Sequence, residues 1–193
     1  GADPSLTSTY CGTRACGDAL RSHGWSVLTE WGNLSQSRFG GAQVNSADEF
    51  LAAGWTIPSG AFAASTFNNP TYFTLADSLQ WYFYSSTGSQ QATYEHTLPV
   101  GTTRVLAAWA GFGRSCTMNV YDGAGVEVFT FTTATSAGGT YTAPTAGPLS
   151  DVRLDMVTLD PAAGPGRIQF REMHDAPGGI CWTLYVLTSS SAT

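Results

Sequence analysis

Four cysteines have the side-chain chemistry that most directly constrains this sequence. Cys11 and Cys16 have four residues between them, whereas Cys116 and Cys181 each lie alone in an apolar run. A structural zinc site needs four ligands with recognisable spacing, and a redox-active pair normally has the spacing C-x-x-C. Neither pattern is present, so an even number of cysteines favours two disulfides. We favour Cys11–Cys16 and Cys116–Cys181; the crossed pairings would instead tie the N-terminal segment to the later strands.

The histidines do not form a recognisable catalytic or metal-binding motif. His23, His96 and His174 lack the short spacing of zinc ligands. His174 and Asp175 are neighbours that would suit a catalytic triad, but the sequence contains no G-x-S-x-G nucleophile motif. We therefore expect His174 to lie in a solvent-exposed turn, and we predict no metal site.

Paired carboxylates are the residues that hydrolyse glycosidic bonds. The candidates lie within or beside expected strands: Glu95, Glu127, Glu172, Asp151 and Asp155. Outward Asp and Glu on strands are ordinary surface residues, and no glycine-rich phosphate loop opens a helix. We predict that the protein is not an enzyme, has no catalytic residue and needs no cofactor.

Aromatic residues suggest a binding surface. The stretch QWYFY places Trp81 and Phe83 on one face of a strand and Tyr82 and Tyr84 on the other. Only one of these faces should belong to the core, so outward tyrosines would stack on sugar rings or pack against a partner. Tyr72 lies in the preceding loop FNNPTYF. The alternative is a set of cross-strand aromatic pairs beneath a covering loop.

Composition favours a secreted or cell-surface protein. Charged residues make up only 11% of the 193 residues, the net charge is −6, and every basic residue other than histidine is an arginine. Scattered arginines in an acidic chain argue against nucleic-acid binding, and no apolar run is long enough to span a membrane. The chain begins Gly-Ala-Asp-Pro, so we expect a processed form without its signal peptide. Asn33, in the sequon NLS, is a predicted glycosylation site.

The local patterns predict an all-β fold with one short helix. Ser46, Glu49 and Gly54 bracket a helix within residues 45–55. Short β-rich runs separated by turn residues predict strands at 24–31, 79–86, 92–98, 104–110, 115–121, 126–133, 151–159, 167–173 and 180–188. We expect an antiparallel β-sandwich or jelly roll of about eight strands. Residues 1–22 form an N-terminal tail and stapled segment, and residues 23–193 form the single sandwich domain.

Two of these runs alternate between apolar and polar residues. In one run, Cys116, Met118 and Val120 share a face with polar residues between them, and in the other Val152, Leu154 and Met156 do so. Alternation with period two predicts one buried and one wet face on each strand. The threonine and asparagine of the first run, and the arginine and aspartate of the second, are therefore expected to face solvent.

The segments YEHTLPVGTTRVLAAWAG and CTMNVYDGAGVEVFTFT resemble the strand-turn-strand rhythm of galactose-binding-like jelly rolls. That resemblance covers about half of the chain and implies a jelly-roll sandwich. It also implies an extracellular carbohydrate-binding or adhesive role, but it assigns no binding residue.

The chain ends suggest a further role. The opening GADPSLTSTY and the closing SSSAT are polar and nearly uncharged, and such ends become ordered when something holds them. We therefore predict a non-enzymatic extracellular structural glycoprotein subunit that self-assembles, as a filament or surface layer, through its tails and sheet edges. The alternative is a carbohydrate-binding or adhesion module of a secreted protein. The expected partners are copies of the chain and attached or bound glycans.

Overall fold

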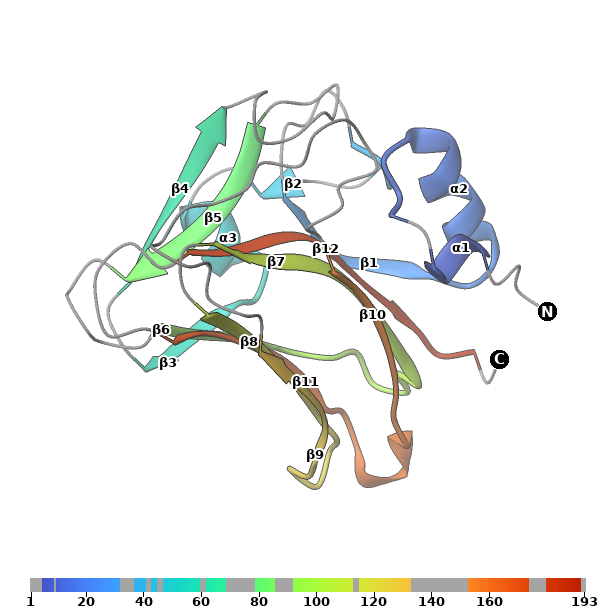
Figure 1. Cartoon of the computed structure of the whole chain (residues 1–193). Helices are drawn as coiled ribbons and strands as arrows, with labels where there is room; N and C mark the ends of the chain where they lie inside the picture. The colour runs from blue at the N-terminus through green and yellow to red at the C-terminus, as the bar shows by residue number, and fades with distance from the viewer. Residues whose placement is uncertain are drawn as a thin grey trace.

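The protein is a β-sandwich, as the sequence predicts (Figure 1). In a computed structural model, the described residues are 5–8, 10–31, 37–40, 43–44, 47–59, 62–68, 79–85, 92–112, 115–132, 153–173 and 180–191. Among them, seven strands form a first sheet and five form a second. Every strand pairing is antiparallel except that between β1 and β2, which is parallel.

The strands of each sheet come from distant parts of the chain. The first sheet has the order β10 (Arg153–Thr158), β7 (Arg104–Phe112), β12 (Ile180–Ser189), β1 (Ser26–Trp31) and β2 (Gln43–Val44), with β5 (Leu79–Ser85) paired to β12 and β4 (Phe62–Asn68) paired to β5. The second sheet has the order β3 (Thr56–Ser59), β6 (Ala92–Thr97), β11 (Arg167–Met173), β8 (Ser115–Tyr121) and β9 (Glu127–Thr132).

Each predicted strand run contains a strand, and the predicted helix at 45–55 contains α3 (Ala47–Ala52). Strands β2, β3 and β4 lie outside the predicted strand runs. Residues 56–68 read TIPSGAFAASTFN, in which proline, glycine and small residues replace the expected alternation. Two further helices, α1 (Ser5–Ser8) and α2 (Arg14–Ser22), and a 3-10 turn, η3 (Pro161–Ala163), were also not predicted.

Helix α2 is held by local chemistry that is easy to miss in the sequence. Thr13 is its N-cap, and the Thr13 hydroxyl accepts a hydrogen bond of 3.2 Å from the backbone N–H of Cys16. Arg21 lies in the last turn, where a cation interacts favourably with the helix dipole. The helix buries Gly17 and Leu20 on one side, and its charged residues Arg14, Asp18 and Arg21 are exposed on the other.

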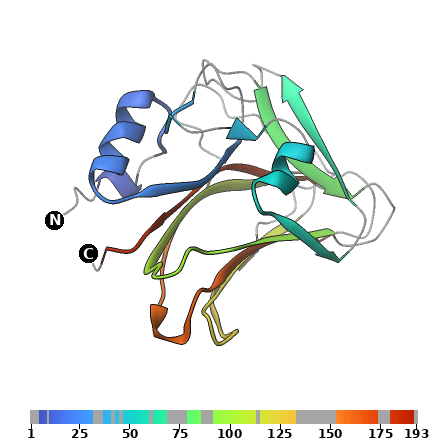
Figure 2. The same ribbon diagram turned by 180° about the vertical axis from the view of Figure 1, so that it is seen from behind.

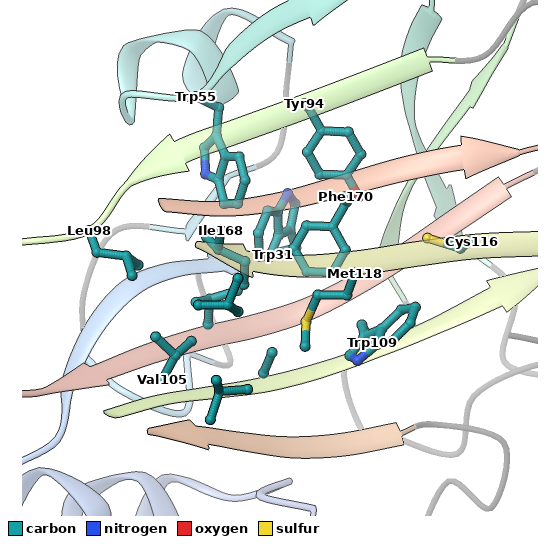
Figure 3. Packing of buried hydrophobic residues seen from close by; sticks show 14 of the residues in the cluster. Trp31, Trp55, Tyr94, Leu98, Val105, Trp109, Cys116, Met118, Ile168 and Phe170 are labelled. Atoms are coloured by element: carbon teal, nitrogen blue, oxygen red, sulfur yellow. The ribbon is translucent and has the colours of Figure 1, made fainter. Parts of the chain in front are cut away.

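The main core lies between the two sheets and is rich in aromatic residues (Figure 3). Trp55 stacks on Phe50 with 5.4 Å between ring centroids, and it meets Tyr94 edge-on at 5.5 Å. Tyr94 in turn stacks on Phe170 at 5.3 Å. Full burial of one such side chain stabilises the fold by roughly 1.5–3 kcal/mol, so this cluster is a principal source of stability.

A second core lies on the outer side of the first sheet, beneath α1 and α2 (Figures 1 and 2). Leu106 in β7 and Leu187 in β12 pack there against Leu20 of α2 and Phe39. Strands β7 and β12 are therefore buried on both faces. Two-sided burial explains why their sequences, VLAAW and LYVL, read as continuous apolar runs rather than alternating ones.

The prediction that β8 and β10 each turn their polar residues toward solvent is wrong. In β8, the side chains of Thr117 and Asn119 are 1% and 2% exposed, although they lie on the outer face of the sheet. Their polar atoms form hydrogen bonds with residues of the neighbouring strand β9. The Thr117 and Thr132 hydroxyls are 2.7 Å apart, and the Asn119 amide donates to the Thr130 hydroxyl at 2.8 Å. Cross-strand hydrogen bonds make their burial tolerable.

Strand β10 has the opposite orientation to the one predicted. Asp155 lies at the margin of the main core, where its carboxylate accepts a 2.8 Å hydrogen bond from the indole N–H of Trp109. Arg153 pairs with Asp155 and lies 3.3 Å from the ring centroid of Phe131. Met156, which was expected to be buried, is 46% exposed. An edge strand permits this arrangement because its charged groups remain close to water.

A buried ion pair connects β1 to the segment that follows it. Glu30 is 1% exposed, and its carboxylate accepts hydrogen bonds from the guanidinium of Arg38 at 2.6 Å and from the Ser37 hydroxyl at 2.8 Å. Arg38 also donates to the Tyr10 hydroxyl at 2.5 Å. Burial lowers the pKa of Arg38, but the neighbouring Tyr10 and Glu30 together raise it above the ordinary value.

Tyr185 of β12 extends this network to the N-terminal segment. Its hydroxyl accepts a 3.0 Å hydrogen bond from the backbone N–H of Cys11, and burial raises the pKa of its phenol. The ring of Tyr185 also stacks on Phe39 with 5.1 Å between centroids. The network therefore holds residues 10–11 and 37–39 against the first sheet.

Breaking the Glu30–Arg38 pair should destabilise the fold strongly. Arg38→Met leaves the Glu30 carboxylate buried without its cation, so we expect the free energy of unfolding to fall by about 3–5 kcal/mol. Urea unfolding followed by tryptophan fluorescence measures this loss. The control is Arg14→Gln, which breaks an exposed, solvent-screened pair with Asp18 and should change stability by no more than about 0.5 kcal/mol. Equal effects of the two variants would contradict this account.

Gly17 allows α2 to approach the chain at Arg38. A Cβ atom at position 17 would overlap the backbone carbonyl oxygen of Arg38, and it would lie 3.1 Å from the Phe39 ring. Glycine is normally unfavourable inside a helix by about 1 kcal/mol relative to alanine. Close packing, rather than helix formation, therefore accounts for the glycine.

The substitution Gly17→Ala distinguishes helix propensity from close packing, because the two effects change the stability of the fold in opposite directions. Helix propensity alone predicts a stabilised protein, whereas the overlap with Arg38 predicts a loss of about 1–3 kcal/mol. We expect the loss, measured as a lower midpoint of thermal unfolding. The neighbouring substitution Asp18→Ala, on the exposed side of α2, should leave the midpoint nearly unchanged.

Candidate functional site

The outer face of the second sheet is polar across four neighbouring strands. Alternate residues of these strands, such as Tyr94, Met118 and Phe170, fill the main core. The residues between them therefore point outward. We call this surface the polar face, and its members are Thr93, Glu95 and Thr97 of β6, Arg167, Gln169 and Arg171 of β11, Thr117, Asn119 and Tyr121 of β8, and Glu127, Thr130 and Thr132 of β9.

Register places a row of hydrogen-bonding groups across the middle of the polar face. Glu95 lies opposite Gln169, Gln169 opposite Asn119, and Asn119 opposite Thr130. The Gln169 amide donates to the Glu95 carboxylate at 2.9 Å, and the Asn119 amide donates to both Thr130 and Glu127. Four strands thus present carboxylate, amide and hydroxyl groups side by side in fixed positions.

Two arginines flank this row along β11. On one side, the Arg167 guanidinium lies 3.2 Å from the Glu95 carboxylate and 4.1 Å from the ring centroid of Tyr121. On the other side, Arg171 is opposite both Thr93 and Thr117. The two arginines balance the charges of Glu95 and Glu127, so the polar face is rich in donors and acceptors but has no net charge.

Three buried atoms of the polar face have no hydrogen-bond partner among the described residues. They are the amide oxygen of Asn119, an acceptor, and Nε of Arg167 and of Arg171, two donors. Nε of Arg167 is nevertheless part of the ion pair with Glu95. The atoms of Asn119 and Arg171 lie in adjacent rows of neighbouring strands. Leaving a buried polar atom without a partner costs roughly 1–3 kcal/mol, so these two atoms would gain from a group that donates and accepts.

The structure contains a disulfide between Cys11 and Cys16, whose Cα atoms are 5.6 Å apart. It closes a small loop at the start of α2. Cys116 is also disulfide-bonded and is buried in the main core. The side chain of Cys181 lies outside the described part, so the pairing Cys116–Cys181 stays a prediction. Because β8 and β12 belong to different sheets, that bond would tie the sandwich together across its core.

The tyrosines singled out from the sequence do not belong to the polar face. Tyr82 and Tyr84 lie in β5 of the first sheet, opposite Trp182 and Ile180 of β12. Their side chains, and all of Tyr72, are outside the described part, as is Asn33. A stacking role for the tyrosines and glycosylation of Asn33 stay predictions.

The carboxylates and histidines considered for catalysis are dispersed. Glu95 and Glu127 lie on the polar face, whereas Asp155 lies at the core margin beneath Trp109. His23 is on the surface at the end of α2, and both ring nitrogens of His96 lie within 2.8 Å of backbone carbonyl oxygens. The side chain of Glu172 and all of Asp151, His174 and Asp175 are outside the described residues.

Within the described ranges, no group of three or more His, Cys, Asp or Glu residues could hold a metal ion. In the same ranges, no helix is long and apolar enough to cross a membrane.

Sequence reasoning did not identify the polar face, although part of its signal was available. The run RIQFREM alternates Arg167, Gln169 and Arg171 with apolar residues, which indicates that they share a face. The alternation does not say which strands lie beside β11. That information is in the register of β6, β8 and β9, which comes only from the folded structure.

Comparison with known proteins identifies no family. No protein-family model matches the chain. No curated protein matches it either.

Solved structures with a similar arrangement of strands do exist. TmCBM61, solved in complex with β-1,4-galactotriose, is 15% identical over 70% of this chain and 87% of its own, with a TM-score of 0.41. A point mutant of the family 29 carbohydrate-binding module CBM29-2 is 10% identical over 86% of this chain and 92% of its own, with a TM-score of 0.45. The active domain of bacteriophage CBA120 tailspike protein 4 is 18% identical over 76% of this chain but only 21% of its own, with a TM-score of 0.48.

In each of these three structures, less than a fifth of the aligned residues are identical to those of this chain. Because each TM-score is below 0.5 and each identity is below 25%, they say nothing about binding or catalysis in this chain.

Peptide mapping of the unreduced protein should recover Cys11 linked to Cys16 and Cys116 linked to Cys181. The first pair is present in the structure, and the second uses the one cysteine that remains for Cys116. Mass spectrometry with thiol blocking before digestion measures both links. A free thiol at Cys181, or a crossed link from Cys11 to Cys181, would contradict this assignment.

Proposed function

We propose that the protein is a non-catalytic carbohydrate-binding module that recognises uncharged saccharides through the polar face. The observation that carries this proposal is the row of Glu95, Gln169, Asn119 and Thr130 across four strands. The row is continuous, and its members come from strands that a packed core holds in place. Binding groups on rigid strands lose little conformational freedom when a ligand binds.

The chemistry of the row suits sugar hydroxyls. A hydroxyl group both donates and accepts hydrogen bonds, and the polar face offers both kinds of partner side by side. The carboxylate of Glu95 accepts, the guanidinium of Arg171 donates, and the amide of Gln169 does both. A ligand hydroxyl that reached the neighbouring unpartnered atoms of Asn119 and Arg171 would satisfy both.

The charge balance favours uncharged saccharides over ionic ones. Glu95 and Arg167 neutralise one another at 3.2 Å, and the remaining Glu127 and Arg171 balance in number. A surface without net charge gives no long-range attraction to an anion or a cation. Hydrogen bonding, rather than electrostatic steering, is therefore the basis for recognition.

Secretion is part of the same proposal. The Cys11–Cys16 disulfide and the low proportion of charged residues support an extracellular or cell-surface location, where disulfides persist. The predicted glycan on Asn33 would be compatible with this location.

The described ends of the chain are held by the chain itself. Near the N-terminus, Leu6 packs against the second core. Near the C-terminus, the Thr103 backbone N–H and hydroxyl donate to the Ser189 carbonyl at 2.8 and 3.1 Å, and the hydroxyl also contacts the Ser191 carbonyl oxygen at 2.5 Å. These contacts remove the need for a second copy to order these segments. Self-assembly through the terminal tails and the sheet edges stays a prediction; residues 1–4 and 192–193 of those tails are outside the described part.

A glycan array probed with the labelled protein tests the proposed function. We expect binding to uncharged oligosaccharides, and Arg171→Gln should weaken it about tenfold or more, because one charged hydrogen bond is worth roughly 1.5–3 kcal/mol. The matched control is Arg153→Gln, which removes an arginine on the first sheet and should leave binding unchanged.

Titration calorimetry on the best array ligand measures both affinities, and circular dichroism shows whether each variant is folded. Absence of binding across the array would overturn the proposal. An equal loss of affinity in Arg153→Gln would show that the polar face is not the binding surface.

A further inference from the structure

A cleft lies on the opposite side of the sandwich from the polar face, between α2, the start of β1 and residues 39–40. This α2 cleft has a volume of about 610 Å³ and is open to solvent. Ligand pockets typically measure roughly 300–1,000 Å³, so the cleft is large enough for a sugar-sized molecule. Figures 1 and 2 show α2 on the outer side of the first sheet, away from the polar face. The lining residues are Asp18, Arg21, Ser22, Trp25, Ser26, Val27, Phe39 and Gly40.

Two guanidinium groups lie close to Gly40 at one wall of this cleft: Arg21 lines the cleft, and Arg14 lies beside Gly40. Gly40 has a positive φ of 75°, and a Cβ atom there would lie 2.6 Å from Nη2 of Arg14 and 3.2 Å from Nη1 of Arg21. The absence of a side chain at position 40 therefore leaves the space that the two guanidinium groups occupy. Like charges repel, so two cations held beside one residue favour an anion between or beside them.

Arg14, Arg21 and Asp18, the charged residues on the cleft lining and beside Gly40, together carry one positive charge in excess. Nε of Arg14 pairs with the Asp18 carboxylate at 3.1 Å, and Nη1 of Arg21 donates to the Phe39 carbonyl oxygen at 2.6 Å. Asp18 neutralises the charge of Arg14. The Phe39 carbonyl oxygen carries no formal charge, so the charge of Arg21 is not neutralised by it. Arg38, which lies next to Phe39 in the sequence, is already paired with Glu30 and adds no net charge. This local charge is opposite in sign to the net charge of −6 on the whole chain.

The walls of the cleft are held rigidly. The Cys11–Cys16 disulfide restrains the start of α2, and Gly17 brings the helix into contact with Arg38. The hydrogen bond from Arg21 to Phe39 joins the end of the helix to the opposite wall. A guanidinium has five N–H donors, so both arginines keep several donors that these contacts do not use.

We propose that this cleft binds the oxyanion of an acidic sugar, a carboxylate or a sulfate ester, through Arg14 and Arg21. Guanidinium groups bind such planar or tetrahedral oxyanions through paired, charge-assisted hydrogen bonds. Ser22 and Ser26 line the same cleft and supply hydroxyl groups for the sugar ring. This site is separate from the polar face and does not depend on the function proposed for it.

Isothermal titration with four probes tests the ligand class. Glucuronate carries a carboxylate, glucose 6-sulfate carries a sulfate ester, glucose carries neither, and inorganic sulfate lacks the sugar. We expect at least one of the two acidic sugars to bind, and glucose to bind at least tenfold more weakly. Binding should also weaken as salt rises from about 0.01 to 1 M, because the Debye length falls from about 30 to 3 Å.

Two variants with opposite expected effects test the residues. Arg14→Gln removes one guanidinium and should weaken binding of the acidic sugar about tenfold. Asp18→Asn removes the competing carboxylate and should tighten the same binding several-fold. Arg153→Gln changes an arginine that does not line the cleft and pairs with Asp155 instead, so it is the charge-matched control and should have no effect. Circular dichroism checks that each variant is folded, and both Arg14 and Asp18 side chains are more than half exposed.

Three results would overturn the proposal. Glucose binding as tightly as both acidic sugars would show that the charge is not recognised. Inorganic sulfate binding as tightly as glucose 6-sulfate would reduce the cleft to an adventitious anion site. Unchanged affinity in both Arg14→Gln and Asp18→Asn would place any acidic-sugar binding elsewhere. Because Arg171→Gln alters only the polar face, its effect on uncharged glycans remains a separate result.

Discussion

The ion pair between Glu30 and Arg38 is the interaction on which the arrangement around the first sheet depends. Two charges removed from water are tolerated only when they neutralise one another and satisfy their remaining hydrogen-bonding groups. Here the pair requires Tyr10 and residues 37–39 to lie beside β1 and β12. The N-terminal helices and the walls of the α2 cleft are consequently placed by a polar network, with the apolar contacts of Leu20 and Phe39 beneath them.

The outer faces of the two sheets differ: one is apolar and covered by helices, and the other is polar. In the first sheet, β7 and β12 are apolar on both faces, so their outer face needs the cover that α1 and α2 provide. In the second sheet, alternation confines apolar side chains to the inner face and leaves the outer face polar. The molecule can therefore offer a binding surface on the second sheet without exposing core residues.

The polar face and the α2 cleft differ in a way that predicts different ligands. On the polar face, arginines and glutamates balance, and Arg167 is paired with Glu95 at 3.2 Å. At the cleft, Arg14 is paired with Asp18, whereas Arg21 donates to a backbone carbonyl and has no carboxylate partner among the described residues. A balanced surface recognises hydroxyl groups by hydrogen-bond geometry, whereas an unbalanced one recognises charge. A module with both would be able to contact an uncharged and an acidic saccharide on opposite sides.

The sequence by itself determined the all-β class, most strands, α3 and the inward face of β8, because turn residues and period-two alternation act over a few residues. It did not determine the orientation of β10 or the burial of Thr117 and Asn119, since these depend on partners such as Trp109 and Thr132. The polar face and the α2 cleft were decided by tertiary structure alone. Register between distant strands and the docking of α2 bring Glu95 to Gln169 and Arg21 to Phe39, and no local pattern encodes such contacts.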